Sequence, residues 1–186
     1  GGKKAEGNGQ MKDLLGGKGA GLAEMTNINI PVPPGFTITT DTCTLFYQNN
    51  MSAPKELKTQ MAEGLTHIEK LTGKKFGDVK DPLLLSVRSG AKFSMPGMMD
   101  TVLNLGLTDE TLKGLIAKTD NERFAYDSYR RFIQMFGNVV LGIDKSEFEE
   151  ILEYRKKKQK IKLDTEMSVD DLKYLIKRYK KKVSEK

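Results

Sequence analysis

The chain has 186 residues, of which 38% are hydrophobic and 30% are charged, and its formal net charge is +6. No apolar run approaches the roughly 20 residues that a membrane-spanning helix needs, so the sequence predicts a globular chain without membrane contact. Its single cysteine, Cys43, excludes an internal disulfide and favours a reducing compartment such as the cytoplasm.

The first distinctive segment is glycine-rich, LLGGKGAGLAEM at residues 14–25, with Lys18 among four glycines. A lysine in a glycine turn just before a helix N-terminus can reach an anion that the backbone amides and the helix dipole also favour. Neither the GxxxxGK[ST] pattern nor the GxGxxG pattern fits these residues. Taken alone, the segment is equally consistent with a flexible turn and with a phosphate site.

Short elements are expected next. Three prolines within residues 31–34 indicate a connection, and alternation of Phe and Ile with threonines predicts a half-buried strand over residues 35–39. Thr40 or Asp41 is expected to cap a helix that continues through Phe46.

A longer amphipathic helix is predicted from Pro54 to Gly73, the residue expected to end it. The apolar positions step by three and four, at Leu57, Met61, Leu65, Ile68 and Leu71. The single histidine, His67, is expected on the surface of this helix without a catalytic role.

The most informative segment is LLLSVRSGAKFSMPGMMDT at residues 83–101. An apolar, strand-like run ends on Arg88 and continues into a small-residue loop that contains Lys92, Pro96 and Gly97. A cation at the end of a buried strand, beside glycines that expose backbone N–H groups, is suited to an oxyanion or phosphate. The sequence therefore predicts a phosphate site here, although the loop's methionines are also consistent with an apolar cover over the core.

Beyond residue 107 nearly every segment has helical periodicity, which predicts an α+β part over residues 1–107 and a helical subdomain over residues 108–186. The best helix is expected over residues 121–136, with Arg131 at the border of its apolar arc and Arg130 on the opposite flank. The arc comprises Phe124, Ala125, Ser128, Tyr129, Phe132, Ile133 and Phe136.

Positive charge gathers in the last segment, where residues 144–186 hold 14 Lys and Arg against 10 Asp and Glu. The basic run at residues 155–162 favours a solvated helix end over nucleic-acid contact, because no aromatic residues interleave to stack on bases. Ser168 and Asp171 resemble a capping box that starts the final helix.

Several segments together resemble the N-terminal nucleotide-binding domain of the pyruvate phosphate dikinase family. They are EGNGQMKDLLGGKGAGLAEM, VPPGFTITTDTC, GKKFGDVKDPLLLSVRSGAKFSMPGMMDTVLNLGL and RFAYDSYRRFIQMFGNVV, with looser similarity in VDDLKYLIKRYKK. The string SMPGMMDTVLNLGL separates the chain from the related phosphoenolpyruvate synthases, which share the glycine–lysine loop but not this methionine-rich one.

The resemblance implies an ATP-grasp fold, here an incomplete lobe with an appended helical subdomain. It also implies conversion of ATP, phosphate and pyruvate into AMP, pyrophosphate and phosphoenolpyruvate. Lys18 and Arg88 correspond to family residues that contact ATP phosphates. Lys92 is expected to extend the positive wall, and the loop through Gly97 is expected to close over the nucleotide.

The resemblance further implies that Arg131 and Lys145 meet a moving phosphohistidine domain of the same full-length chain; ordinary surface charge is the alternative. The ligands for Mg²⁺ and the phosphocarrier histidine are expected downstream of Lys186, so no metal ligand is assigned here and the chain alone is not expected to turn over. A homodimer is expected only for the full-length enzyme.

Two further alternatives stay open at this point. The chain is also consistent with a truncated, non-catalytic paralogue that regulates the full enzyme, or with a module that docks a partner through its basic tail. The family occurs in bacteria, plastids and parasite compartments, so a plastid or another organelle is an alternative to the cytoplasm.

Overall fold

The computed structural model describes residues 4–90 and 100–186. Packing divides the chain into two compact units: unit 1 comprises Gly1–Lys74 with Arg88–Asp100, and unit 2 comprises Lys75–Val87 with Thr101–Lys186. The sequence-based division at residue 107 stays a prediction. Within the described ranges, none of the helices has both the length and the apolar character needed to span a bilayer.

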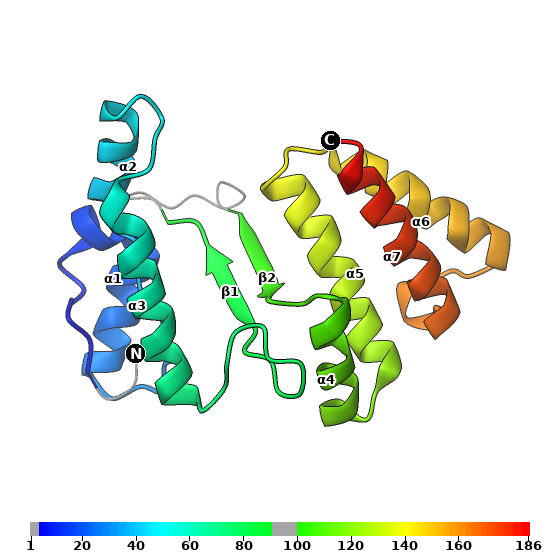
Figure 1. Cartoon of the computed structure of the whole chain (residues 1–186), viewed down its shortest axis with the longest axis horizontal. Coiled ribbons are helices and arrows are strands. Elements are labelled where there is room, and N and C mark those ends of the chain that lie inside the picture. Colours follow the sequence, from blue (N-terminus) through cyan, green and yellow to red (C-terminus); the bar gives the residue numbers. More distant parts are fainter. Residues whose placement is uncertain (1–3, 91–99) are drawn as a thin grey trace. The chain divides into compact units, whose positions relative to one another are not determined.

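Unit 1 contains three helices, α1 (Lys12–Asn27), α2 (Thr40–Gln48) and α3 (Lys55–Thr72) (Figure 1). The predicted start and end of α3 are confirmed: Pro54 precedes it, and Gly73 ends it with a φ of 69°. This left-handed conformation carries little penalty in glycine.

The start of α2 differs from the prediction. Thr39 is its N-cap residue, and neither Thr40 nor Asp41 caps it. The Thr40 hydroxyl instead donates a hydrogen bond of 2.5 Å to the carbonyl of Asp13 in α1. The predicted cap is therefore wrong because this hydroxyl is used to join two helices.

The strand predicted over residues 35–39 is also wrong, since this segment forms no ladder with any other described residue. Its side chains contact helices instead. The Phe36 ring lies 2.7 Å from the position that a Cβ on Gly64 of α3 would occupy, and the Thr37 hydroxyl lies 3.1 Å from the corresponding position on Gly19 of α1. Alternation in the sequence thus reflects contacts with two helices rather than the two faces of a sheet.

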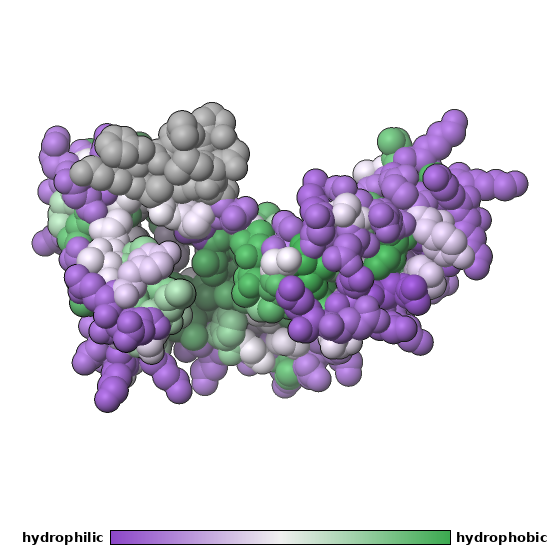
Figure 2. Space-filling view, turned by 90° about the horizontal axis from the view of Figure 1, so that it is seen from above, coloured by the Kyte–Doolittle hydropathy of each residue, from purple (hydrophilic) through white to green (hydrophobic). Residues whose placement is uncertain are grey.

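Unit 2 is mainly helical. It contains α4 (Asp109–Thr119), α5 (Glu122–Val139), α6 (Lys145–Gln159), a 3-10 turn (Asp164–Glu166) and α7 (Val169–Ser184). Helix α5 packs against α4, α7 and β2 (Figure 1). In Figure 2, hydrophobic residues gather over the part of unit 2 that carries β2 and α5, whereas hydrophilic residues dominate the surface of α6 and α7.

Two short strands, β1 (Leu85–Arg88) and β2 (Thr101–Leu105), form an antiparallel pair. The strand predicted to end on Arg88 is confirmed, but its predicted burial is wrong: Leu85 is half-buried and the other three residues of β1 are exposed. The buried residue of this run is Leu83, which precedes the strand. A helix-rich chain with this small sheet is compatible with the predicted α+β class.

The helix predicted over residues 121–136 is confirmed as α5, and the Asn121 side chain accepts a hydrogen bond from the Phe124 amide. Its predicted faces need two corrections. Phe124 is 49% exposed rather than part of the core, and Arg130 is buried with only 3% of its surface exposed. Arg130 tolerates burial because acidic side chains surround its guanidinium, a feature that helical periodicity does not report.

The predicted capping box at α7 is confirmed, with hydrogen bonds in both directions between Ser168 and Asp171. Burial raises the pKa of Asp171, but hydrogen bonds from Ser168 and the charge of Arg155, 2.7 Å away, outweigh burial and leave the pKa below its usual value. The carboxylate form therefore stabilises the fold.

We expect Asp171→Asn to lower the free energy of unfolding by about 2 kcal/mol at pH 7, because it removes a charged cap and one partner of a poorly exposed ion pair. Since the native pKa is depressed, this stabilisation is present above the unfolded pKa of about 4 and disappears as the pH falls through the native value. Urea unfolding at pH 7 and in acid measures the difference. The exposed neighbour is the control: Asp170→Asn is expected to change stability by less than ~0.5 kcal/mol.

Candidate functional site

The glycine-rich segment is a broken helix. Gly16 lies inside α1 with φ 69° and ψ 166°, a combination that is essentially restricted to glycine. The break ends one short helical turn, and a second helical run begins after it, with Lys18 in its first turn. Lys18 therefore lies within the start of a helix, not in a turn before it as predicted.

Lys18 contacts the residue that follows Arg88. Its Nζ atom donates a hydrogen bond of 3.1 Å to the main-chain carbonyl of Ser89, 71 positions further along the chain. All three residues belong to unit 1. In this neighbourhood Lys18 therefore contacts the main chain next to Arg88, and Arg88 is exposed at the end of β1.

Ser89 also fixes the end of the strand pair. Its amide and its hydroxyl both donate to the Asp100 carbonyl, at 3.0 and 3.1 Å. These two bonds join Ser89 to Asp100. Lys92 and Gly97, the other two residues predicted to bind the nucleotide, lie outside the described residues.

The charges of this neighbourhood are open to an anion. Within residues 4–90 and 100–186, neither Lys18 nor Arg88 forms an ion pair, and the partner of Lys18 is a neutral carbonyl. A carbonyl competes for an ammonium group less strongly than a phosphate does, because charge-assisted hydrogen bonds are the stronger ones. The arrangement can therefore exchange the carbonyl for an anionic oxygen.

The described residues do not supply a metal site. No group of three or more His, Cys, Asp or Glu side chains among them is arranged to hold an ion. His67 is exposed on α3, as predicted.

The two residues predicted to dock another domain lie on unit 2, both exposed. Arg131 on α5 is 58% exposed and its Nε atom donates 3.0 Å to Asp127, while Lys145, the first residue of α6, is 67% exposed and pairs at 2.8 Å with Glu149. The hydrogen bond that Lys145 donates to the Glu149 carboxylate raises the pKa of Lys145.

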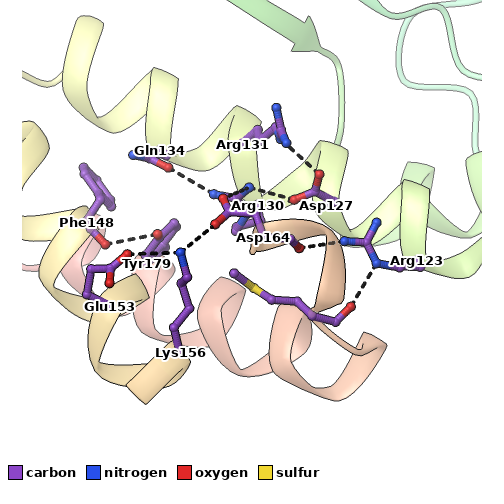
Figure 3. A network of polar contacts seen from close by, with 11 residues as sticks. Arg123, Asp127, Arg130, Arg131, Gln134, Phe148, Glu153, Lys156, Asp164 and Tyr179 are labelled. Atoms are coloured by element: carbon purple, nitrogen blue, oxygen red, sulfur yellow. Dashed lines mark hydrogen bonds and ion pairs between the residues drawn. The ribbon is translucent and has the colours of Figure 1, made fainter. Parts of the chain in front are cut away.

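Sequence reasoning missed the polar network behind Arg131 (Figure 3). Asp127 binds Arg130 as well as Arg131, and Arg130 also approaches Asp164 at 3.7 Å. The spacing of Asp127, three and four positions before two arginines on one helix, was the available signal. The contact with Asp164 had no signal in the sequence.

The basic run at residues 155–162 is only partly solvated. Arg155 pairs with Asp171 at 2.7 Å and Lys156 with Asp164 at 3.2 Å, so these two cations hold α6 to later parts of unit 2. A hydrogen bond to Asp164 raises the pKa of Lys156. Lys157 and Lys158 are exposed, which agrees with a solvated helix end.

Comparison with known proteins first gives the class of domain. Residues 12–55, which include the broken helix and Lys18, match the family described as pyruvate phosphate dikinase, AMP/ATP-binding domain. The class of domain that these residues resemble is thus an AMP/ATP-binding domain.

Relatives then give the particular family. The chain is 53% identical over 178 residues to pyruvate, phosphate dikinase of Clostridium symbiosum, covering 96% of this chain and 20% of the relative. It is 53% identical over 182 residues to pyruvate, phosphate dikinase of Rhizobium meliloti, covering 98% of this chain and 20% of the relative. It is 56% identical over 177 residues to the chloroplastic enzyme of Flaveria trinervia, covering 95% of this chain and 18% of the relative. The chain belongs to the pyruvate phosphate dikinase family and spans about one fifth of the length of these relatives.

A matched pair of substitutions tests the break in α1. We expect Gly16→Ala to destabilise the protein by about 1–3 kcal/mol, because alanine is strained at this φ and ψ. Gly21→Ala in the same helix is the control; nothing lies within 4 Å of the added Cβ. It should be neutral or stabilise by up to about 1 kcal/mol. Thermal unfolding measures both, and equal effects would show that Gly16 is not strained.

Proposed function

We propose that the chain is the ATP-binding, N-terminal portion of a pyruvate phosphate dikinase and supplies the phosphate-binding cations of a split active site. The observation that carries this proposal is the hydrogen bond from Lys18 to Ser89, next to Arg88. Membership of the family supports it, since residues 12–55 match an AMP/ATP-binding domain.

In this proposal Lys18 and Arg88 bind the triphosphate of ATP. Lys18 exchanges its bond to the Ser89 carbonyl for a phosphate oxygen, and Arg88 holds two oxygens with its planar guanidinium. Phosphoryl transfer depends mainly on positioning and charge neutralisation, which two cations can supply without covalent chemistry. Lys92 extends the positive charge, and the loop through Gly97 covers the nucleotide.

The rest of the site is assigned to other parts of a longer chain. We propose that the two units form an incomplete ATP-grasp lobe with a helical subdomain, and that Mg²⁺ is held by acidic residues downstream of Lys186. Phosphoryl transfer goes to a histidine in a separate phosphohistidine domain, which docks at Arg131 and Lys145. The overall reaction converts ATP, phosphate and pyruvate into AMP, pyrophosphate and phosphoenolpyruvate, in a homodimer that operates in the cytoplasm or a plastid.

The roles of the two cations are tested in the longer protein that carries this chain. We expect Lys18→Ala and Arg88→Ala each to slow phosphoenzyme formation from labelled ATP by about a hundredfold, because each removes a charged donor to the transferring group. His67→Gln, an exposed change on α3, is the control and should leave the rate unchanged.

A normal rate of phosphoenzyme formation in the Lys18→Ala, Arg88→Ala double variant would show that the assignment is wrong. A reading frame that stops after Lys186 would favour a non-catalytic binding protein instead. A thermal shift with ATP, compared between this chain and the longer protein, then measures how much of the nucleotide's binding energy comes from the downstream residues.

A further inference from the structure

One carboxylate on α5, that of Asp127, holds two arginines at once. Its Oδ1 atom accepts from Nε and Nη2 of Arg130, at 3.0 and 2.7 Å, and its Oδ2 atom accepts from Nε of Arg131 at 3.0 Å (Figure 3). Both oxygens are thereby used. The orientation of Arg131 depends on where this carboxylate is held.

The two arginines differ in exposure although they are adjacent in sequence. Only 3% of the Arg130 side chain is exposed, against 58% for Arg131, and Asp127 between them is 17% exposed. A buried guanidinium is costly unless its donors are satisfied, so Arg130 holds Asp127 strongly. Arg131 extends from the same carboxylate into solvent.

Further contacts fix Arg130 from its other side. Its Nη1 atom donates 3.3 Å to Gln134, and its Nη2 atom lies 3.7 Å from a carboxylate oxygen of Asp164. Asp164 begins the 3-10 turn that precedes α7 and also binds Lys156 of α6, at 3.2 Å. The position of Asp127 is thus tied to three successive elements rather than to α5 alone.

A third arginine on α5, Arg123, also holds the 3-10 turn. Arg123 donates to the main-chain carbonyls of Asp164 and Met167, at 2.7 and 2.9 Å, and these bonds fix the turn against the start of α5. An exposed arginine normally loses side-chain entropy when it binds a partner. Arg131, restrained in advance by this framework, loses less.

The ion pairs of the network contain three cations, on Arg130, Arg131 and Lys156, and three anions, on Asp127, Glu153 and Asp164. Arg131 is the most exposed of these cations, at 58% against 3% for Arg130 and 14% for Lys156. It is therefore the cation of this network that an anionic group in solution can reach, at a fixed place on α5.

We propose that Asp127 and Arg130 are positioning residues that hold the Arg131 guanidinium in readiness for an anionic group on a docking protein domain. This inference rests on the proposed function, in which that domain is the phosphohistidine domain. A carboxylate or a phosphate on its surface is the chemistry that a restrained guanidinium recognises. Asp127 and Arg130 act through Arg131 and do not touch the partner themselves.

A double-mutant cycle in the longer protein tests this. Arg131→Ala is expected to slow single-turnover phosphoryl transfer to the histidine by about tenfold, with the affinity for ATP unchanged, because a charge at the docking surface is lost. Asp127→Asn is expected to slow transfer by about fivefold, because Arg131 keeps its charge but loses the carboxylate that restrains it. The double variant should be no slower than Arg131→Ala alone, because without Arg131 the carboxylate of Asp127 has nothing left to position.

Glu122→Gln is the matched control. It removes an exposed ion pair between the start of α5 and Lys173 of α7, and neither residue contacts Asp127, Arg130 or Arg131. It should leave the rate of transfer unchanged. Where Asp127→Asn does not fold, Arg130→Lys replaces it in the cycle, since lysine keeps the charge but cannot grip Asp127 with two nitrogens.

The outcomes separate the two proposals. Additive losses for Arg131→Ala and Asp127→Asn, or slowing by Glu122→Gln equal to that by Asp127→Asn, would overturn the positioning roles and leave docking at Arg131 intact. A normal transfer rate in Arg131→Ala would refute docking at this residue and the inference with it. The proposed phosphate contacts of Lys18 and Arg88 would not be affected, because Lys18→Ala and Arg88→Ala test them separately.

Discussion

The hydrogen bond from the Lys18 ammonium to the Ser89 carbonyl is the contact on which the candidate site depends. It requires the break at Gly16, which starts a new helical run just before Lys18, and it requires the bonds from Ser89 to Asp100 that fix the end of β1. Because the acceptor is an uncharged main-chain oxygen, the bond places the ammonium without neutralising it. A carboxylate in that position would place it equally well but would compete with a phosphate.

Features that depend on neighbouring residues were predicted well from the sequence, whereas features that depend on distant residues were not. The predicted helix end at Gly73 and the predicted capping box of Ser168 and Asp171 are correct, because a cap involves only a few neighbouring residues. The strand at residues 35–39 failed because a strand requires a partner, whereas the alternating side chains here contact α1 and α3. Arg130 was placed on the wrong face, since periodicity treats every arginine as polar and Asp164, which pairs with it, is 34 positions away.

The candidate site was predicted by a different route. A lysine in a glycine turn before a helix suggested an anion site in one segment, and an arginine at the end of a strand suggested one in the other. Only the family resemblance joined these two segments, which lie 71 positions apart at Lys18 and Ser89. The structure adds the contact between Lys18 and Ser89, together with the absence of an ion pair on Lys18 and Arg88 within the described ranges. It also adds a restrained cation on unit 2, whose contact with Asp127 was signalled by spacing along α5 but whose contact with Asp164 through Arg130 was not.

The two sets of cations are held in opposite ways, and the difference bears on their roles. Lys18 rests on a neutral carbonyl that it can leave, whereas Arg131 remains bound to a carboxylate that Arg130 fixes. A buried ion pair seldom stabilises a protein more than well-packed apolar residues would, so stability alone gives little reason to bury Arg130 beside Asp127 and Asp164. Orientation of an exposed neighbour is a property that an apolar side chain cannot supply. The burial of Arg130 is therefore better explained by its orientation of Arg131 through Asp127 than by a contribution to the stability of the core.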